Sequence, residues 1–550
     1  MYEQLIQKIK ELKPDKTQLR LLKIEACKSL NLKQMPTDSQ LILNAKKEDF
    51  DVLKRILLAK PTRTISGVAP IAIFCKPHHC PHGKCVFCVG GIGSPFGDVP
   101  QAYTGEGSAA KRAIRNHYDP YLQIFNRLEH YFVNGHSAEK VEIIVMGGTF
   151  PALDLAYQTE FITYTFKAMN DFSDLFFNKE FDLLKFKEFF ELPVDNLSKE
   201  RTERIHKKLL ELKGTSTLEK EKTRNESSKI KCIGLTIETK PDWAKLAHGN
   251  LMLEQGCTRV EVGVQSVYED VLKFMHRGHT LEDTKESIRI LKDLGFKINA
   301  HMMPGMIEDK EKELAGLKEI FSNPDFRPDM MKIYPCLVFK GTGLFTLWKA
   351  GKFKPLETED AALMIAKFKQ FIPEYCRVMR VQRDLPHYQI DAGVKKPNLR
   401  QLIELKTKEL RIKCKCIRCR EIKNEKIESP TLIVREYEAS KGKEFFISFE
   451  EKDRIIGFCR LRFPSQFLRP EITKDSALIR ELHIYSQALS LGKTGSSQHK
   501  GFGKQLLEKA EEIAKLNNKN KIVVISGVGV RNYYKKFNYS LEGPYMVKQI

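Results

Sequence analysis

Four cysteines in the segment CKPHHCPHGKCVFC are near enough in sequence to share one metal centre. Cys80, Cys85 and Cys88 have the spacing Cys-x4-Cys-x2-Cys, and Cys75 precedes them. Three thiolates can hold an iron-sulfur cluster while one iron stays free to bind a substrate group. A closed zinc site, made by all four cysteines or by three of them with a neighbouring histidine, fits the same residues equally well. On this segment alone both interpretations stay open.

A second group of cysteines has the tight spacing of thiolate ligands to zinc. Cys414, Cys416 and Cys419 occur in KCKCIRCRE, and Zn²⁺ prefers four ligands in tetrahedral geometry. No fourth ligand is adjacent, although a distant histidine such as His387 or His483 would complete the site. The alternative is a set of reduced thiols on a basic loop. If zinc binds, the position between two domains predicts a structural site.

A glycine-rich turn near the carboxyl terminus could bind a pyrophosphate. The segment QHKGFG contains Gln498, Gly501, Phe502 and Gly503 and precedes an amphipathic stretch. The free N–H groups at a helix start attract phosphate groups. Glycine-rich helix starts are common, so the turn needs support from its surroundings.

The composition indicates a globular, multidomain protein. The 550 residues are 42% hydrophobic and 29% charged, with a net charge of +22, which is typical of nucleic-acid binders. We find no apolar run long enough to span a bilayer and no secretory leader. We therefore expect a cytoplasmic protein with no membrane partner, in which clustered cysteines bind metal ions and do not form disulfides.

The elements that must position these motifs fall into four predicted regions. Residues 1–64 have apolar positions at helical spacing between lysines and predict a small basic helical module. Residues 65–345 alternate six β-branched runs with helical patterns, which predicts an α/β fold with a partial (β/α)6 barrel. Residues 346–429 form a linker with the second cysteine group. Residues 430–550 predict a smaller α/β domain of four antiparallel strands, a helix, a strand and a short final helix.

This organisation predicts the character of one insertion and the place of the active site. The interval of roughly residues 170–229 is an over-long insertion, and its polar stretch GTSTLEKEKTRNESSK predicts a mobile loop. Active sites of such barrels lie at the carboxyl ends of the strands, where the CKPHHCPHGKCVFC segment follows the first predicted strand.

The combination of motifs resembles the radical S-adenosylmethionine (SAM) superfamily. The cysteine segment, the strand ending in MGGTF and the strand RVEVGVQS occur in that order. The usual superfamily spacing is Cys-x3-Cys-x2-Cys; the altered spacing, together with AYTGEGSAAKRAIRNHYDPY, is similar to the catalytic third subunit of the Elongator complex. The resemblance covers most of residues 65–550.

That resemblance implies roles for particular residues. Cys80, Cys85 and Cys88 are expected to hold a [4Fe-4S] cluster, and Cys75 to be a structural thiol. Contacts with SAM are expected from six residues: Gly147, Gly148, Thr149, Glu238, Glu261 and Gln265. Ordinary strand ends and ion pairs inside the barrel are the alternative for each of them taken singly.

The last 120 residues resemble the Gcn5-related N-acetyltransferase (GNAT) fold. The order of ELHIYS, the turn QHKGFG, the strand VVISGV and NYYKKFNY matches that fold. The resemblance implies that Tyr534, with Tyr533 as the neighbouring candidate, donates a proton to the departing CoA thiolate; core packing is the alternative for Tyr533. It also implies acetyl-CoA contacts from the strand residues Leu482, His483 and Ile484, from the glycine-rich turn, and from Lys140.

The family resemblance implies one reaction that uses both halves. A 5′-deoxyadenosyl radical from SAM would take hydrogen from the acetyl methyl group of acetyl-CoA, and the carbon radical would add to C5 of the wobble uridine of tRNA. Thioester hydrolysis would leave 5-carboxymethyluridine. The anticodon loop of tRNA and an electron donor are the expected partners, and a homodimer or a larger complex is compatible with the sequence. The rival hypotheses are a protein lysine acetyltransferase with a structural iron-sulfur barrel, and a non-catalytic RNA-binding scaffold.

Overall fold

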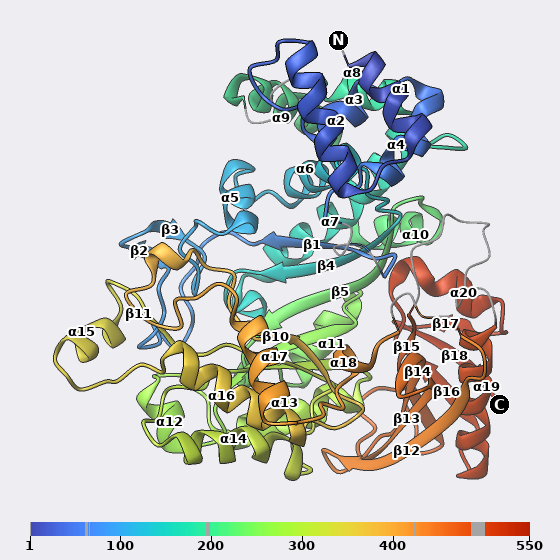
Figure 1. Ribbon diagram of the computed structural model, residues 1–550. Coiled ribbons are helices and arrows are strands. Elements are labelled where there is room, and N and C mark those ends of the chain that lie inside the picture. Colours follow the sequence, from blue (N-terminus) through green and yellow to red (C-terminus); the bar gives the residue numbers. More distant parts are fainter. Residues whose placement is uncertain are drawn as a thin grey trace.

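The computed structural model describes residues 2–60, 64, 66–193, 198–422, 425, 427–485 and 501–550. Figure 1 shows a helical lobe at the amino terminus, a curved sheet with surrounding helices in the centre, and a second sheet at the carboxyl terminus. The expected α/β class, with a parallel sheet followed by a second, smaller α/β domain, is confirmed. Within the described residues, no helix is long and apolar enough to cross a membrane.

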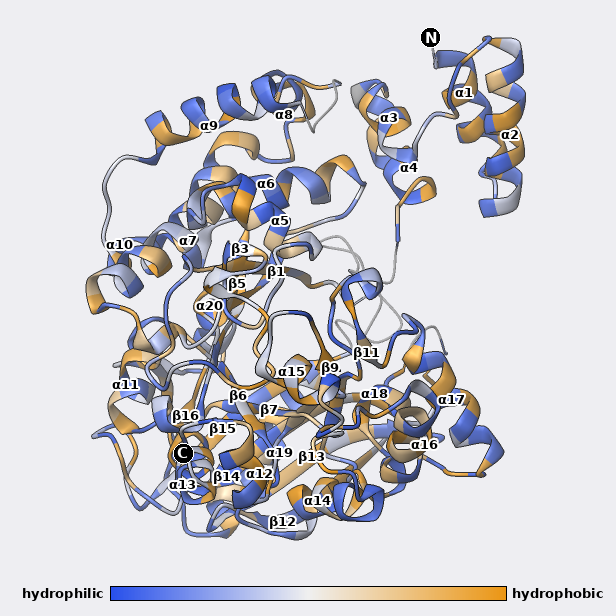
Figure 2. Ribbon diagram, turned by 90° about the vertical axis from the view of Figure 1, so that its left-hand side faces the viewer, coloured by the Kyte–Doolittle hydropathy of each residue, from blue (hydrophilic) through white to orange (hydrophobic). Residues whose placement is uncertain are grey.

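The amino-terminal lobe consists of four short helices. These are α1 (Glu3–Leu12), α2 (Lys16–Ser29), α3 (Asp38–Leu43) and α4 (Phe50–Ile56). α2 begins after Asp15, whose carboxylate accepts hydrogen bonds from the backbone N–H groups of Thr17 and Gln18, as expected of a helix cap. The lobe projects from the body in Figure 2. It is attached where the Ser39 hydroxyl lies 3.0 Å from Asn134 Oδ1.

The central sheet contains seven parallel strands in the order β1-β4-β5-β6-β7-β8-β10. Their bounds are β1 (Ala69–Phe74), β4 (Lys140–Met146), β5 (Lys231–Thr239), β6 (Arg259–Gln265), β7 (Lys297–Met302), β8 (Met330–Ile333) and β10 (Arg377–Arg380). The first six are the predicted strands. The seventh comes from the region predicted as a linker, where the four residues RVMR are too short and too charged to predict a strand.

Helices surround this sheet, and several of them pack against its outer face. They are α5 (Ser108–Arg115), α6 (Pro120–Val133), α7 (Leu155–Phe176), α11 (Leu246–Glu254), α12 (Glu269–Phe274), α13 (Leu281–Asp293), α14 (Lys310–Ser322), α15 (Gly343–Lys349), α16 (Thr358–Phe368), α17 (Leu399–Glu409) and α18 (Ile417–Arg420). Two small ribbons, β2 (Gly91–Ser94) with β3 (Gly97–Val99) and β9 (Leu337–Val338) with β11 (Ala392–Gly393), complete this part. The sheet is therefore buried on its outer side, as a parallel sheet requires.

The prediction of a mobile loop in the insertion is wrong for the described residues. The interval contains α8 (Leu183–Phe189), α9 (Lys199–Lys213) and α10 (Leu218–Ser227). α10 forms within the polar stretch because the Thr217 hydroxyl caps its first turn and because Asn225 is fully buried. The Asn225 amide donates to Asn170 Oδ1 of α7 at 2.8 Å. The polar composition of this stretch does not indicate that one face of α10 is buried.

The carboxyl-terminal sheet is mixed and has the order β12-β13-β14-β15-β16-β18-β17. Its strands are β12 (Thr431–Ala439), β13 (Gly442–Glu451), β14 (Arg454–Phe463), β15 (Ser476–Ile484), β16 (Lys521–Val524), β17 (Ser540–Glu542) and β18 (Tyr545–Gln549), with helices α19 (Phe502–Leu516) and α20 (Arg531–Lys535). The predicted order of strands and helices is confirmed up to α20. The chain does not end with that helix, because the hairpin β17–β18 follows and returns to pair with β16.

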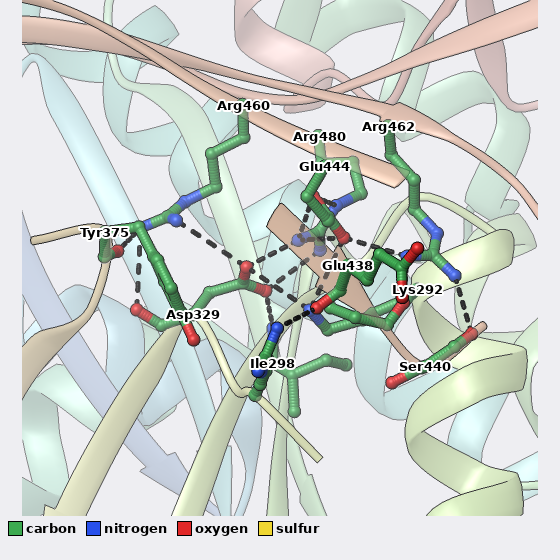
Figure 3. A network of polar contacts seen from close by, with 12 residues as sticks. Lys292, Ile298, Asp329, Tyr375, Glu438, Ser440, Glu444, Arg460, Arg462 and Arg480 are labelled. Carbon is green, nitrogen blue, oxygen red and sulfur yellow. Dashed lines mark hydrogen bonds and ion pairs between the residues drawn. The ribbon is translucent and has the colours of Figure 1, made fainter. Parts of the chain in front are cut away.

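A network of buried charges joins the two sheets (Figure 3). It contains four basic and four acidic side chains: Lys292, Arg460, Arg462 and Arg480 with Asp293, Asp329, Glu444 and Glu481. Arg462 Nη2 donates to Asp293 Oδ1 at 2.6 Å, and Arg480 Nη1 donates to Asp329 Oδ2 at 2.9 Å. Since buried charges need partners, each half supplies the counterions of the other.

Candidate active sites

The three-cysteine loop begins where β1 ends. The Cys75 N–H donates to Met146 O of β4 at 3.1 Å, so the loop leaves the sheet at the carboxyl ends of two neighbouring strands. Cys80, Cys85 and Cys88 are buried, with 8%, 7% and 4% of their surface exposed. Burial raises the pKa of Cys80 and raises that of Cys88 to about 11. Thiolates at these positions therefore need cations to stabilise them.

The surroundings of the three sulfurs fit an iron-sulfur cluster. Among the described residues, Cys80, Cys85 and Cys88 do not form one of the groups compact enough to hold a single ion. A cluster spreads its thiolate ligands over several irons, so it suits wider spacing. The sulfurs also have polar neighbours that suit thiolates: Ala102 N–H lies 3.3 Å from Cys88 Sγ, and the Thr149 hydroxyl lies 3.6 Å from Cys80 Sγ. Cys80, Cys85 and Cys88 are the residues that would hold the cluster.

Cys75 lies below the loop and has a different environment. It is fully buried, and burial raises the pKa of its thiol to about 12. A Cβ at Gly147 would lie 2.7 Å from its sulfur, and a Cβ at Gly148 would lie 3.8 Å from Cys80 Sγ. Both glycines have positive φ, +125° and +110°, so the turn after β4 needs glycine for conformation and for close packing. Thr149 follows in the same turn.

The predicted acidic residues lie on the inner face of the half-barrel. Glu238 of β5 and Glu261 of β6 are opposite each other in register. Burial raises the pKa of Glu238 to about 7. Burial also opposes ionisation of Glu261, but Lys332 and His301 hold its pKa well below its usual range. His301 Nε2 lies 2.8 Å from Glu261 Oε2. Two neighbouring carboxyls thus have opposite protonation tendencies.

Gln265 closes β6 in a strained conformation. Its φ is +68°, and its side-chain Oε1 is buried without a hydrogen-bond partner among the described residues. Buried polar atoms normally have partners, and a positive φ at a non-glycine residue is uncommon. The unpartnered oxygen fits a residue that waits for a polar ligand, as expected for SAM.

Several polar residues near this site were missed from the sequence. Lys332 forms an ion pair with Glu261 and lies 3.7 Å from Glu238, and the Tyr103 hydroxyl donates to Glu238 at 3.4 Å. A lone lysine in the apolar run MMKIY was the available signal, because charges inside a buried strand usually face a site or a partner. Tyr103 comes from a loop, so no periodicity could have indicated it.

The second cysteine group converges, but its fourth ligand does not appear among the described residues. The sulfurs of Cys414, Cys416 and Cys419 lie within 4.8 Å of one another, and neither His387 nor His483 belongs to that group. The suggestion that one of these histidines completes the site is therefore wrong for this conformation. Contacts with the other two thiols lower the pKa of Cys416 in spite of its burial. The donor set fits zinc, whose fourth ligand would come from elsewhere.

The residues predicted to bind acyl-CoA lie where two strands of the carboxyl-terminal sheet separate. β15 and β16 run parallel through the pair Ile479 and Val524, after which Leu482, His483 and Ile484 pair with β14. Within the described part of the chain, no strand pairs with the other edge of β15 at these three residues, so this edge can hydrogen-bond an extended chain. Burial lowers the pKa of His483 to about 4, so its imidazole is neutral at pH 7.

The start of α19 lies against this edge. Gly501 caps the helix with φ +79°, and Phe502 is buried. A Cβ at Gly503 would lie 2.8 Å from the Tyr533 hydroxyl and 3.9 Å from Ile484 Cγ1. The helix start, the strand edge and the Tyr533 hydroxyl therefore meet at one place. Gln498 lies outside the described residues.

The two tyrosines of α20 differ in position. Tyr534 is only 6% exposed and contacts the ring of Tyr539, whereas Tyr533 is half-buried. Burial raises the pKa of both phenols, so both keep their protons at neutral pH. The three atoms nearest to a Cβ built at Gly503 include the Tyr533 hydroxyl and no atom of Tyr534. Of the two phenols, Tyr533 is therefore the one that lies at the start of α19.

α20 is held by the barrel as well as by its own domain. Glu226 of α10 forms ion pairs with Arg531 at 3.1 Å and with Lys535 at 2.8 Å. A Cβ at Gly529 would lie 2.7 Å from Lys231 Cβ at the start of β5. Lys140 is exposed at the start of β4, directly opposite Lys231 in register. The acyl-CoA side thus faces the amino ends of the barrel strands, and the cysteine loop faces their carboxyl ends.

These features define a radical SAM enzyme fused to a GNAT domain. Family models agree: the Radical SAM superfamily matches residues 76–319, the Radical_SAM C-terminal domain 328–409 and the Acetyltransferase (GNAT) family 417–539. The ELP3 N-terminal domain matches residues 1–65. The Radical SAM domain implies SAM and a [4Fe-4S] cluster, and the GNAT domain implies acetyl-CoA.

Relatives along almost the whole chain identify the family. The chain is 43% identical over 530 residues to the tRNA uridine(34) acetyltransferase of Methanocaldococcus jannaschii, covering 94% of this chain and 90% of that one. It is 41% identical over 517 residues to the Elongator complex protein 3 of Homo sapiens, covering 91% and 87%. A solved structure of Methanocaldococcus infernus Elp3 without residues 1–46 is 37% identical, with a TM-score of 0.72 over 88% of this chain and 100% of that chain. The chain belongs to the Elongator complex protein 3 (Elp3) family.

Proposed function

We propose that this enzyme forms 5-carboxymethyluridine at the wobble uridine of tRNA, using SAM and acetyl-CoA. The main support is that one body, joined by the buried charge network, carries both the cysteine loop and the acyl-CoA edge. An acetyltransferase alone does not need three convergent thiols, and a radical enzyme alone does not need acetyl-CoA. The relative in Methanocaldococcus jannaschii is named for the same nucleotide position of tRNA.

At the barrel site the protein's task is to bind and orient SAM. A cluster held by Cys80, Cys85 and Cys88 would supply one electron for the cleavage of SAM. The turn of Gly147, Gly148 and Thr149 lets the backbone approach the methionine group, while Gln265 offers its unpartnered amide oxygen. Glu238 has a pKa of about 7, so part of it is protonated at neutral pH and can donate a hydrogen bond to the ligand. Glu261 is ionised and can only accept one.

At the second site the protein's task is to hold the CoA arm and protonate its sulfur. The N–H groups at the start of α19, from Gly501 to Gly503, suit the pyrophosphate, and the edge of β15 suits the amides of the pantetheine arm. We assign the proton donor to Tyr533 in preference to Tyr534, because its hydroxyl contacts Gly503. A protonated phenol can deliver a proton to the leaving thiolate.

The amino-terminal lobe contributes less free positive charge than its sequence suggests. Lys23 pairs with Asp38 at 2.7 Å, Lys10 with Asp49 at 2.5 Å and Lys8 with Glu25 at 2.9 Å. The overall charge of +22 still favours an anionic partner such as tRNA. We also predict three kinds of partner. They are the anticodon loop of tRNA, an external electron donor, and further protein chains in a homodimer or larger assembly.

The experiment is a reconstitution with labelled acetyl-CoA. The full chain is loaded anaerobically with iron and sulfide and given reductant, SAM, methyl-labelled acetyl-CoA and unmodified tRNA. Labelled 5-carboxymethyluridine in the digested tRNA supports the proposal. A parallel reaction replaces tRNA with lysine-bearing peptides: acetylated peptide without labelled tRNA would favour the acetyltransferase instead. 5′-Deoxyadenosine with neither product would point to another substrate.

A further inference from the structure

Arg277 places a buried positive charge against one ligand of the cluster. Its residue is 7% exposed. The guanidinium Nη1 donates to Cys85 Sγ at 3.3 Å, and Nη2 donates to Gly263 O at 2.9 Å. None of the ion pairs between described residues includes Arg277, and its Nε is buried without a partner there. A buried cation is costly without a nearby negative charge, and the thiolate of Cys85 supplies one.

The backbone around this contact is shaped to allow it. A Cβ at Gly263 would lie 2.9 Å from Arg277 Nη2, so a side chain at that position would displace the guanidinium. Gly278 has φ +68°, and a Cβ there would lie 2.4 Å from the Cβ of His82. His82 Nε2 in turn lies 3.2 Å from Cys85 Sγ and donates to it when that nitrogen carries the proton. Two glycines thus bring two nitrogen donors to one sulfur.

The three cysteine sulfurs have different polar neighbours. Cys80 Sγ has a hydroxyl neighbour, Thr149 at 3.6 Å, and Cys88 Sγ accepts one backbone N–H, from Ala102 at 3.3 Å. Of the three, Cys85 alone has a hydrogen bond from a cationic side chain among the described residues. Hydrogen bonds to the sulfurs and nearby charge set the reduction potential of an iron-sulfur cluster. The cationic contact at one sulfur should therefore affect the reduction potential of the cluster.

Burial without a carboxylate does not by itself single out Arg277. Arg112 is also 7% exposed, and its Nη2 donates to Ala72 O at 2.6 Å. No ion pair between described residues includes Arg112 either. What distinguishes Arg277 is its contact with sulfur, and Arg112 supplies a matched control.

We propose that Arg277, with His82 as a second donor, tunes the reduction potential of the cluster through Cys85. One-electron reduction by an external reductant adds negative charge to the cluster and breaks no bond. A positive guanidinium at a ligand sulfur stabilises that added charge and makes reduction easier. Arg277 is thus a positioning and tuning residue that acts through Cys85. The inference concerns the cluster alone, so it holds whether or not tRNA is the substrate.

The test is a redox titration of the reconstituted full chain. Sodium dithionite and mediators reduce the wild type and three variants, Arg277→Gln, Arg277→Lys and Arg112→Gln, and electron paramagnetic resonance reports the reduced cluster in the absence of SAM and tRNA. Arg277→Gln is expected to lower the reduction equilibrium constant on the order of tenfold, a shift of about 59 mV to more negative potential. Arg277→Lys should keep most of the wild-type potential, and Arg112→Gln should keep all of it.

A wild-type potential in iron-loaded Arg277→Gln overturns the proposal. If its potential is unchanged but its affinity for SAM falls, Arg277 serves the cofactor carboxylate instead. If Arg277→Gln does not load iron, His82→Phe carries the test, because it removes the second donor and keeps Arg277. A midpoint equal to that of the wild type in iron-loaded His82→Phe would then overturn the shared role at Cys85.

Discussion

Arg480 and Asp329 face each other across the boundary between the two sheets, with Nη1 of the arginine 2.9 Å from Oδ2 of the aspartate. Both side chains are fully buried. Burial opposes ionisation of Asp329, but Arg480 and Lys292 hold its pKa well below its usual range. The pair is therefore charged at every working pH. Loss of Arg480 would leave the buried Asp329 with two more distant cations, Arg460 at 3.6 Å and Lys292 at 4.0 Å.

Substitution of Arg480 by methionine should destabilise the whole chain. Breaking a buried pair by removing one partner costs roughly 3–5 kcal/mol, which should appear as a large drop in thermal midpoint measured by circular dichroism. The matched control is Arg204→Met, because Arg204 is 58% exposed and pairs with Glu191 on the surface; surface pairs contribute about 0–1 kcal/mol. Equal midpoints for the two variants would contradict the role given to the network.

Substitution of Cys85 by serine should abolish the radical half and spare the acyl-CoA half. We expect reduced iron content and no cleavage of SAM, measured as 5′-deoxyadenosine, while calorimetric binding of acetyl-CoA stays at the wild-type level. Cys27→Ser in the amino-terminal lobe is the control, since Cys27 lies outside the barrel. Undiminished SAM cleavage in Cys85→Ser would remove that residue from the cluster.

Tyr533→Phe and Tyr534→Phe should separate the two tyrosines. Loss of a proton donor in the reacting position slows chemistry by about 10²–10⁴-fold, so CoA release should fall strongly in Tyr533→Phe with little change in SAM cleavage. Tyr534→Phe should act mainly on thermal stability, because that ring is packed in the core. The reverse pattern in CoA release would return the proton-donor role to Tyr534.

Glu226→Gln should disturb the acyl-CoA site from outside its own domain. The substitution weakens the ion pairs that hold Arg531 and Lys535, so α20 should lose its fixed position. We expect weaker acetyl-CoA binding by calorimetry with iron content unchanged. Glu219→Gln on the same helix is the control, since Glu219 is 77% exposed and pairs with Lys222. Identical acetyl-CoA binding in both variants would argue against the idea that Glu226 holds α20 in place.

The cysteines of the second group should hold about one zinc ion per chain, measured by mass spectrometry of metals. Cys416→Ser should lose the zinc, lower the thermal midpoint and retain the iron. Zinc should also leave as the pH falls, because its thiolate ligands must be deprotonated. A chain that retains full zinc in Cys416→Ser would place the metal elsewhere.

The sequence predicts the sheets better than it predicts their junction. Six β-branched runs are strong signals for the barrel strands, and the glycines of MGGT and QHKGFG indicate turns where backbone must approach a ligand. The strand RIIGFCRLRF illustrates the limit. Its alternating Arg460 and Arg462 are typical of a solvent-facing edge, yet both are fully buried against the barrel. Only the packing of two domains decides that, and single-strand periodicity carries no information about it.

The candidate site shows the same division between local and long-range information. Cys80, Cys85 and Cys88 lie within one short segment, so their spacing is visible in sequence. Arg277 contacts Cys85 from 192 residues away, and nothing in HRGHT indicates that contact. Contacts of this kind depend on the closure of the barrel, which a one-dimensional pattern does not describe.

The opposed ends of the barrel strands impose a distance on the chemistry. The turn of Gly147 follows the last residue of β4, whereas Lys140 begins it beside the segment that carries Gly529. A strand of seven residues spans about 20 Å. Under the proposed function, an acyl arm anchored at α19 would have to extend toward the barrel, and it would stay joined to the uridine until its thioester is hydrolysed. The cofactor arm would then be the part of the proposed complex that bridges the two ends of the barrel strands.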